Sequence, residues 1–442
     1  MKVVQVLNHF LPDQTAGTEI YVWALSKQLQ NNGFQVKIVI PNNGEDISEN
    51  YVYDELQVHK FAENSVVDRS LIMGFRKPNG LAFFIEYLKE FQPTIVHFHE
   101  LAGSNGITLH HVTAAKSLGI KVLFTFHLAG YTCKTGTLLY NSNSLCNGEI
   151  LINNCSNCYL HSKGYTHFKY LLNPISQLLQ VANINSTKWN NKIGTALGTS
   201  FIVERQKQDF QRLIDNCDTV IALTKWYEKM LLLNGVSQNK INFIPQGLPF
   251  KASDQSFSKR KATEKPLRLM FLGRISYFKG LHLLIEAMLE LPKEAVLLNI
   301  YGHPDNSNYE QLLKDKTNQF DNIRWCGKLK QDEVIDTMQH HHTLCLCSTF
   351  SEMSPLVIQE AFAAGIPVLA SNVYGNAEQI MDGKNGWLFK FNDSNALKIK
   401  LQQLIDDPSL VEKAQKNFET VRNFDAVAKE QMIVYEKLVY SA

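Results

Sequence analysis

The chain has 442 residues and a formal net charge of +2, which comes from 44 basic and 42 acidic side chains. This length favours two domains, because single domains run to about 100–200 residues. The balanced charge gives no argument for nucleic acid as a partner, and no run of about 18 apolar residues predicts a membrane-spanning helix. The N-terminus shows no secretory signal, so we expect a cytoplasmic protein whose cysteines are thiols or metal ligands before they are disulfides.

The first half of the chain alternates short apolar runs with amphipathic stretches such as Glu19–Gln30. Five apolar runs predict buried strands: Val3–Leu7, Val36–Ile40, Ile95–Phe98, Val122–Phe126 and Thr219–Leu223. Apolar strands that alternate with helices predict a parallel sheet covered on both faces. We therefore expect an α/β domain over residues 1–247. Residues from Cys133 to about Arg212 fit this pattern less well and are interpreted as a cysteine-rich insertion or extended connection.

The strand pattern begins again after residues 248–266, which are polar, weakly patterned and interpreted as a linker. Five further strands are predicted: Leu267–Leu272, Val296–Tyr301, Ile323–Cys326, Leu344–Cys347 and Pro367–Ala370. They predict a second α/β domain over residues 267–423. Residues 424–442 predict one long C-terminal helix. One arrangement to be tested is that this helix packs back against the first domain. Two such domains in tandem place a ligand at the carboxyl ends of their strands.

Two glutamates, Glu352 and Glu360, lie before and after the predicted start of the helix that follows the fourth strand of the second domain. Ser354 suits the N-cap and Pro355 the first helical position, with a stop at Gly365. The free N–H groups and positive dipole end of such a helix favour a diphosphate. Glu352 then lies in the loop, where it can reach a sugar, and Glu360 lies on the second turn, where it can accept hydrogen bonds from a ribose. The alternative is an ordinary helix with two solvated glutamates.

Two cations follow the first strand of the second domain. Gly273 would let the backbone approach a ligand closely, and Arg274 and Lys279 could clamp phosphates, Arg through its fork and Lys as a point charge. Two exposed surface cations are the alternative. The position at the carboxyl end of a strand favours the phosphate clamp.

Together these segments resemble glycosyltransferase family 4, the group 1 glycosyl transferases of GT-B architecture. The resemblance rests on four motifs: Gly273-Arg274…Lys279-Gly280, Glu352…Glu360, Gly375-Asn376-Ala377-Glu378 and Asp382-Gly383-Lys384-Asn385-Gly386. It implies two Rossmann-like domains that face each other across a cleft. It also implies transfer of a sugar, with retention, from a UDP- or GDP-sugar.

The resemblance also implies residue roles. Arg274 and Lys279 would bind the donor diphosphate, Glu352 would contact the donor sugar, and Glu360 would hold the ribose. The N–H groups of Leu356 and Val357 would meet phosphate.

One departure concerns the segment Glu352-Met353-Ser354-Pro355, where the family often has Glu-Gly-Phe-Gly. Pro355 lacks an N–H donor, which leaves the sugar identity open. No residue stands out as a covalent nucleophile, so we expect a front-face mechanism in which a leaving phosphate oxygen takes the acceptor proton. No Asp-X-Asp motif is suitably placed, so no catalytic metal is expected.

The resemblance implies that the first domain binds the acceptor, and this domain supplies further candidate residues. The loop before Glu19 resembles the family's first glycine loop, with Ala16 in place of one glycine, and places Gly17 near the donor; a plain helix-entry turn is the alternative. His127 ends a strand, as a histidine does in many relatives, although Leu128 replaces their Asp. The resemblance implies that His127 contacts the sugar, whereas a lone histidine of this kind is more often structural.

His97 and His99 end the neighbouring predicted strand and are expected to line the cleft.

Four cysteines cluster after this strand: Cys133, Cys146, Cys155 and Cys158. The two-residue spacing of Cys155 and Cys158 is typical of zinc knuckles, and four thiolates would complete a tetrahedral site. The other gaps match no standard finger. We predict a structural zinc, with free thiols and then disulfides as the alternatives.

A basic segment spans residues 163–212. Its charged side chains are Lys163, Lys169, Lys188, Lys192, Arg205, Lys207 and Arg212, against Glu204 and Asp209. Apolar residues lie among them, which is consistent with peripheral contact with the inner membrane surface. A solvated face over a buried apolar stripe is an equal alternative.

These observations predict a metal-independent retaining hexosyltransferase that acts on a glycan or lipid-linked acceptor in cell-surface polysaccharide synthesis. One alternative is a nucleotide-sugar epimerase-like GT-B enzyme. A phosphorylase would need a pyridoxal-binding lysine context, which is not found. Another alternative, an inactive zinc-bearing interaction protein, would not need Arg274, Lys279 and both glutamates.

Overall fold

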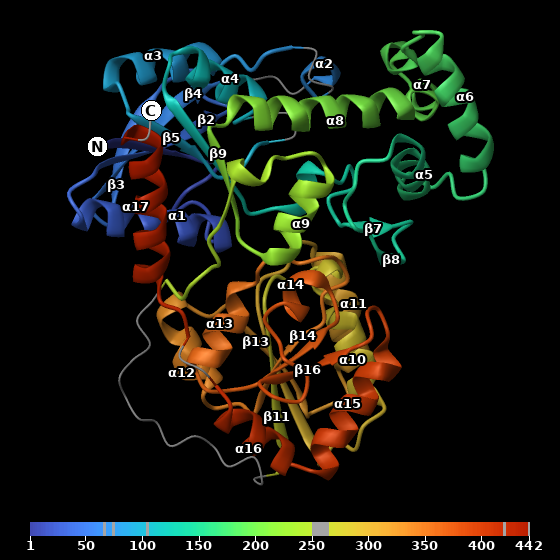
Figure 1. Cartoon of the computed structure of the whole chain (residues 1–442). Helices are drawn as coiled ribbons and strands as arrows, with labels where there is room; N and C mark the ends of the chain where they lie inside the picture. Colours follow the sequence, from blue (N-terminus) through green and yellow to red (C-terminus); the bar gives the residue numbers. More distant parts are fainter. Residues whose placement is uncertain (65–67, 73–75, 103–105, 250–264, 419–420, 441–442) are drawn as a thin grey trace. The chain divides into compact units, whose positions relative to one another are not determined.

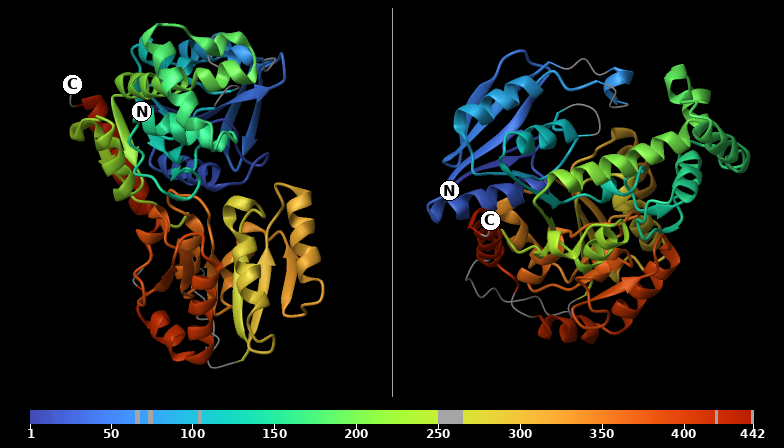
Figure 2. Two further views of the ribbon diagram at one scale, coloured as in Figure 1. Left: turned by 90° about the vertical axis from the view of Figure 1, so that its right-hand side faces the viewer. Right: turned by 45° about the horizontal axis from the view of Figure 1, so that its top comes forward.

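The computed structural model describes residues 1–64, 68–72, 76–102, 106–249, 265–418 and 421–440. The chain divides into two compact units, the first formed by Met1–Pro245 with Phe424–Ala442 and the second by Gln246–Asn423. Each unit is a sheet with helices packed on it (Figures 1 and 2). The linker predicted at residues 248–266 lies mostly outside the described residues.

The first unit holds an eight-stranded sheet with the order β10-β9-β6-β5-β1-β2-β4-β3, in which only β3 pairs antiparallel with its neighbour. The strands are β1 (Lys2–Val6), β2 (Gln35–Asn43), β3 (Glu49–Tyr53), β4 (Leu56–Glu63), β5 (Ile95–Phe98), β6 (Lys121–Phe126), β9 (Thr219–Ala222) and β10 (Ile241–Phe243). The central strand β1 is buried on both faces, which is why its sequence is a continuous apolar run.

The chain moves outward from β1 in one direction through β2 and in the other through β5. This reversal makes the carboxyl ends of β1 and β5 a topological switch point, the place where open α/β sheets bind ligands.

The helices of the first unit fall into a covering set and an insertion. The covering set is α1 (Gly17–Asn31), α3 (Leu81–Phe91), α4 (Leu109–Ser117), α9 (Lys225–Leu233) and α17 (Phe424–Tyr440). The short helix α2 (Arg69–Ile72) contacts the insertion, where Arg69 donates to the Thr187 carbonyl oxygen at 2.9 Å. The insertion holds the hairpin β7 (Leu139–Tyr140) and β8 (Ser144–Leu145), with α5 (Ile152–Ser162), α6 (Lys169–Val181), α7 (Lys192–Leu197) and α8 (Thr199–Asn216). This insertion departs from the strand–helix alternation of the rest of the unit.

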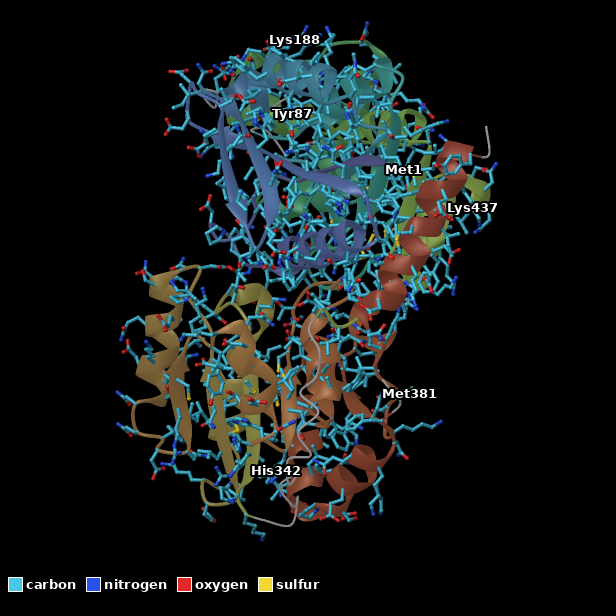
Figure 3. The ribbon with its side chains drawn as sticks, turned by 90° about the vertical axis from the view of Figure 1, so that its left-hand side faces the viewer. Met1, Tyr87, Lys188, His342, Met381 and Lys437 are labelled. Atoms are coloured by element: carbon cyan, nitrogen blue, oxygen red, sulfur yellow. The ribbon has the colours of Figure 1, made fainter. Side chains whose placement is uncertain are left out.

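The C-terminal helix α17 packs on the first unit beside α1. Gln28 Nε2 donates to Asp425 Oδ1 at 2.7 Å, and the rings of Tyr21 and Phe424 meet edge to face at 5.2 Å. Both ends of the chain therefore belong to one unit, which carries the side chains of Met1 and Lys437 (Figure 3).

The second unit holds a parallel six-stranded sheet with the order β13-β12-β11-β14-β15-β16. Its strands are β11 (Leu267–Leu272), β12 (Val296–Tyr301), β13 (Ile323–Gly327), β14 (Thr343–Leu346), β15 (Val368–Ser371) and β16 (Gly386–Phe389). Its helices are α10 (Leu281–Leu289), α11 (Ser307–Thr317), α12 (Val334–Met338), α13 (Leu356–Ala363), α14 (Tyr374–Ala377), α15 (Ser394–Asp406) and α16 (Ser409–Lys416).

Helices cover both faces of this second sheet. Along β11, Leu269 and Phe271 pack into one buried apolar cluster and Met270 packs into another, as alternating side chains of a strand must. The strand order reverses between β11 and β14, so their carboxyl ends form the switch point of the second unit.

Candidate active site

The site in the second unit begins where β11 and β14 end. The turn after β11 closes at Gly280, which has a positive φ of 68°. A Cβ atom on Gly280 would lie 1.8 Å from the carbonyl oxygen of Cys347, so only glycine lets the two segments approach this closely. This approach brings Lys279, which precedes the glycine, beside the loop that follows β14.

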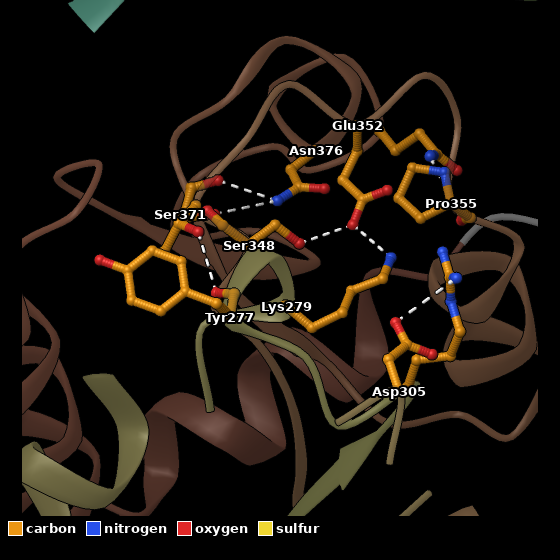
Figure 4. A network of polar contacts seen from close by, with 11 residues as sticks. Tyr277, Lys279, Asp305, Ser348, Glu352, Pro355, Ser371 and Asn376 are labelled. Atoms are coloured by element: carbon orange, nitrogen blue, oxygen red, sulfur yellow. Dashed lines mark hydrogen bonds and ion pairs between the residues drawn. The ribbon is translucent and has the colours of Figure 1, made fainter. Parts of the chain in front are cut away.

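Lys279, from the turn after β11, and Glu352, from the loop after β14, form a direct ion pair (Figure 4). Lys279 Nζ lies 2.6 Å from Glu352 Oε1, and Ser348 Oγ donates to the same oxygen at 2.6 Å. The side chains of Lys279 and Glu352 are only 19% and 9% exposed, so solvent screens the pair weakly. Neither contact uses the second carboxylate oxygen, Oε2, which is left for another hydrogen-bond donor.

The backbone of Glu352 is positioned by α14. A Cβ atom on Gly375 would lie 2.3 Å from the carbonyl oxygen of Glu352, so glycine permits this close packing. The buried Asn376 side chain donates to the Ser371 carbonyl oxygen at 3.0 Å, and Ser371 Oγ donates to the Ser348 carbonyl oxygen at 2.8 Å. The Gly375-Asn376 motif therefore supports the carboxylate loop from behind.

The helix after this loop starts one residue later than predicted. Pro355 is its N-cap, with φ −67° and ψ 119°, and α13 begins at Leu356. The prediction of Ser354 as cap was wrong, because the extended ψ of Pro355 keeps this residue outside the helix, while its carbonyl accepts from Ile358 N–H at 3.2 Å. The N–H groups of Leu356 and Val357 still open the helix, where no intrahelical acceptor exists.

Glu360 lies on the second turn of α13 and is buried, with 8% of its surface exposed. Burial raises the pKa of its carboxyl group, and a hydrogen bond from Gln331 Nε2 to Oε1 at 2.7 Å opposes this rise. Gln331 was not expected from the sequence, because it comes from the short 3-10 helix Gln331–Glu333 before α12, 29 positions before Glu360.

Arg274 does not share the environment of Lys279. Its side chain is 70% exposed, and Nη1 lies 3.5 Å from Asp305 Oδ2, a weak surface contact. The structure thus places the two predicted clamp cations on the same β11 loop but with different partners.

In the first unit, His127 is buried at the end of β6. The ring of Tyr21 packs edge to face on it at 4.8 Å, and burial lowers the pKa of His127 to about 3. His97 and His99 are fully buried, and burial lowers the pKa of each well below 6.5. All three imidazoles are therefore neutral at physiological pH.

A buried hydrogen-bond chain fixes the tautomer of His127. Gln5 Nε2 donates to the Tyr435 hydroxyl at 3.2 Å, which leaves Gln5 Oε1 as the acceptor for His99 Nε2–H at 2.7 Å. A neutral His99 then has an unprotonated Nδ1, which accepts from His127 Nε2–H at 3.1 Å. His127 Nδ1 is consequently the unprotonated nitrogen, free to accept a hydrogen bond from a hydroxyl group.

Gly17 is the first residue of α1, and its N-cap Ala16 makes no side-chain cap hydrogen bond. Two residues later Glu19 is buried, and its Oε1 accepts from Gln14 Nε2 at 2.7 Å. Burial raises the pKa of Glu19 to about 7, with a smaller contribution from Glu100. Glu19 was not predicted as a site residue, although an acidic residue in the first turn of the helix that follows β1 was a signal in the sequence.

The cysteine cluster does not form a metal site as it stands. Cys133 Sγ lies 3.2 Å from Thr135 Oγ1, and Cys158 Sγ donates to the Leu139 carbonyl oxygen at 3.3 Å. Within the described ranges, no group of three or more His, Cys, Asp or Glu side chains is arranged to hold a metal ion, and all the cysteines are free thiols. The structural zinc stays a prediction without support from this geometry.

Across the described part of the chain, no helix combines the length and the apolar character needed to cross a membrane.

Comparison with known proteins links both units to one group of enzymes. Residues 252–421 match the family model described as Glycosyl transferases group 1, and residues 15–145 match that described as Glycosyltransferase Family 4.

Curated relatives are about a quarter identical to the chain over the stretches that match. An uncharacterized glycosyltransferase of Methanocaldococcus jannaschii is 26% identical over 238 residues, which cover 51% of this chain and 60% of the relative. The amylovoran biosynthesis glycosyltransferase AmsK of Erwinia amylovora is 24% identical over 290 residues, 64% of this chain and 69% of the relative. A putative colanic acid biosynthesis glycosyltransferase, WcaL of Salmonella typhimurium, is 26% identical over 220 residues, 48% of this chain and 53% of the relative. The matches thus span about half to two thirds of these relatives.

Solved structures resemble the whole chain. A sucrose-phosphate synthase from Thermosynechococcus elongatus superposes with a TM-score of 0.66 at 17% identity and covers 100% of both chains. Anabaena HepE in complex with UDP-glucose has a TM-score of 0.61 at 12% identity, covering 100% of this chain and 99% of its own. At this identity the likeness shows the fold, and the predicted GT-B architecture is confirmed.

Proposed function

Because the chain belongs to the glycosyl transferases group 1 family, we propose that it transfers a hexose, with retention, from a UDP- or GDP-sugar. The observation that carries this proposal is the Lys279–Glu352 pair at the switch point of the second sheet. It combines a cation for a diphosphate with a carboxylate for sugar hydroxyls, at the place where such sheets bind ligands.

The ion pair gives the donor a specific task. A diphosphate that enters beside Lys279 competes with Glu352 for the ammonium group, because phosphate offers more negative charge. As Lys279 turns to the diphosphate, Glu352 Oε1 becomes available to accept a hydrogen bond from a sugar hydroxyl. Binding of the whole donor thus replaces one ion pair by two interactions with the ligand.

The remaining residues complete this arrangement. Glu360 would exchange its hydrogen bond from Gln331 for hydrogen bonds from ribose hydroxyls. Arg274 and the N–H groups of Leu356 and Val357 would offset the charge that develops on the leaving diphosphate. His127 Nδ1 would accept from a sugar hydroxyl, and Gly17 would lie near the donor.

In the proposed chemistry the anomeric C–O bond to the diphosphate breaks while the acceptor oxygen attacks the same face. The leaving phosphate oxygen takes the acceptor proton, so the reaction needs neither a covalent nucleophile nor a divalent metal ion. The relatives named for amylovoran and colanic acid synthesis support a glycan or lipid-linked acceptor in polysaccharide synthesis. The protein would then work in the cytoplasm, next to the membrane that carries such acceptors.

The test combines binding and turnover. Isothermal titration with UDP and GDP should identify one nucleotide that binds, and a panel of its sugars should identify one donor that turns over in EDTA. NMR of the early product should show the same anomeric configuration as the donor. Failure of both nucleotides to bind would overturn the proposal, and a requirement for added magnesium or manganese would contradict its metal-independent step.

A further inference from the structure

The helix α6 in the insertion of the first unit has its polar face inside and its apolar face outside. Helices on a globular protein normally bury the apolar stripe. The buried residues of α6 are instead Lys169, Asn173 and Ser176. This inversion requires a compensating partner for each face.

The inner face of α6 has its partners within the protein. Lys169 Nζ donates to Asn141 Oδ1 at 3.2 Å, and Asn173 Nδ2 donates to Asn153 Oδ1 at 2.6 Å. Ser176 Oγ accepts from the N–H group of Ser200, the second residue of α8, at 2.9 Å. The hydrogen bonds offset the cost of burying these polar groups, so the orientation of α6 is set by contacts within the insertion.

The outer face of α6 carries a continuous apolar stripe. Its residues follow the helical repeat and are largely exposed: Tyr170 73%, Leu171 63%, Ile175 37%, Leu178 69% and Val181 87%. A contiguous apolar face of this kind marks an interaction site, because single exposed apolar residues are common but gathered ones are not.

Neighbouring elements extend this apolar face. Phe168 precedes α6 and is 66% exposed, Trp189 before α7 is 49% exposed, and Ile193 on α7 is 67% exposed. Together with the five residues of the stripe we call these the α6 surface. Figure 1 shows α6 and α7 gathered at the beginning of the long helix α8.

The segment that carries the α6 surface has charge of a single sign. No acidic residue occurs between Glu149 and Glu204, whereas Lys163, Lys188 and Lys192 in this interval are exposed. Figure 3 shows Lys188 on the surface of the first unit. A cavity of about 390 Å³ beside the end of α6 is lined by Glu204, Arg205 and Arg212 of α8. Both arginines pair with Asp209 at 3.5 Å, so the exposed lysines supply the positive charge of this surface.

We propose that the α6 surface binds an anionic lipid bilayer, with its apolar stripe at the level of the headgroups and its lysines against lipid phosphates. An apolar face without carboxylates and framed by lysines matches a negatively charged apolar interface, and a tryptophan at its edge suits the headgroup region. A second copy of the chain would present the same lysines to one another, which disfavours self-association. The inference goes beyond the proposed transfer reaction and uses none of its residues.

Vesicle sedimentation tests the proposal with the full chain. The protein should bind vesicles of phosphatidylcholine with one-third phosphatidylglycerol, should not bind pure phosphatidylcholine, and should detach as salt rises. Leu171→Asp with Leu178→Asp should lower partitioning by about tenfold or more, because charge enters the apolar interface. Neutralising Lys188 and Lys192 to Gln should lower it by about fivefold per lysine.

Matched controls keep the result specific. Leu312→Asp with Ile399→Asp changes two residues of the second unit that are 54% and 49% exposed, and should bind vesicles as the wild type does. Lys413→Gln with Lys416→Gln, on α16, is the charge control. Nucleotide affinity should stay the same in all four variants, so a failure of the proposed transfer function would be seen separately.

Absence of wild-type binding to anionic vesicles at low salt would overturn the proposal. So would equal binding to neutral vesicles, or vesicle binding by Leu171→Asp/Leu178→Asp equal to that of the wild type. A third outcome would also overturn the proposal. If the wild type does not bind vesicles but sediments as a dimer without lipid, and this variant sediments as a monomer, the α6 surface binds a second copy of the chain.

Discussion

Each unit carries a buried polar network at its switch point, and the two networks differ in charge. In the second unit Lys279, Glu352 and Ser348 meet at one carboxylate oxygen. In the first unit Gln5, His99 and His127 form a neutral chain whose donors all point in one direction. An ion pair can be opened by an anionic ligand, whereas a neutral chain only presents a fixed acceptor. The difference predicts that diphosphate affinity depends on the second unit and sugar orientation on the first.

The largest effect is expected from Lys279→Ala, which removes the cation and leaves Glu352 partly buried without its ion-pair partner. The loss should be about 1.5–3 kcal/mol in nucleoside diphosphate binding or in transition-state stabilisation. Isothermal titration and kcat/KM measure it. Arg274→Ala is the comparison variant. Its loss of binding or transition-state stabilisation should be no larger than that of Lys279→Ala, because Arg274 is exposed. Wild-type affinity and turnover in both variants would refute the clamp.

The two glutamates should separate binding from turnover. Glu360→Gln should weaken the binding of free nucleotide about tenfold, because the Glu360 carboxylate is proposed to hold the ribose. Glu352→Gln should not weaken the binding of free nucleotide. It should lower kcat by about tenfold or more, because Glu352 is proposed to contact the sugar. Titration of nucleotide and steady-state kinetics distinguish them. An equal loss of nucleotide affinity in both variants would show that the roles are not divided.

Tyr435→Phe should break the neutral chain. The variant leaves Gln5 Nε2 and His97 Nδ1 buried without the hydroxyl group, at a cost of about 1–2 kcal/mol in the free energy of unfolding. Gln5 can then turn over, so the tautomer of His127 is no longer fixed and turnover should fall while nucleotide affinity is unchanged. Denaturant unfolding and titration check both parts. Reduced nucleotide affinity in this variant would contradict the assignment of diphosphate binding to the second unit alone.

The smallest effect concerns the pH dependence of stability through Glu19. The folded state holds the Glu19 proton up to about pH 7, whereas the unfolded chain releases it near the ordinary pKa of 4.5. Between these values the folded state binds more protons, so this group makes stability fall as pH rises. Glu19→Gln should therefore be more stable than the wild type at pH 8 by about 1 kcal/mol or more, and equal to it below pH 4.5. Denaturant unfolding at both pH values tests this, and a variant less stable at pH 8 would contradict the buried neutral carboxyl.

The second sheet was the more readable of the two. Its five predicted strands appear with at most one residue of difference at an end, because buried parallel strands are continuous apolar runs. The short edge strand β16 was missed. In the first unit the strands β3, β4 and the three-residue β10 were missed. Both β3 and β4 mix polar with apolar residues, and the edge strand β3 is largely exposed, so neither stands out as an apolar run.

The sequence alone determined that this is an α/β protein with two sheets, and which loops carry the cations and carboxylates, because these follow from local apolar patterns and short motifs. The tertiary structure decided which side chains meet. The pairing of Lys279 with Glu352 depends on the backbone approach at Gly280, and the tautomer of His127 depends on Tyr435, which lies 308 positions further along the chain than His127. The exposed face of α6 was likewise decided by polar contacts from α5 and α8. Contacts between distant segments leave no periodic signal in the sequence, since each partner satisfies only its own local pattern.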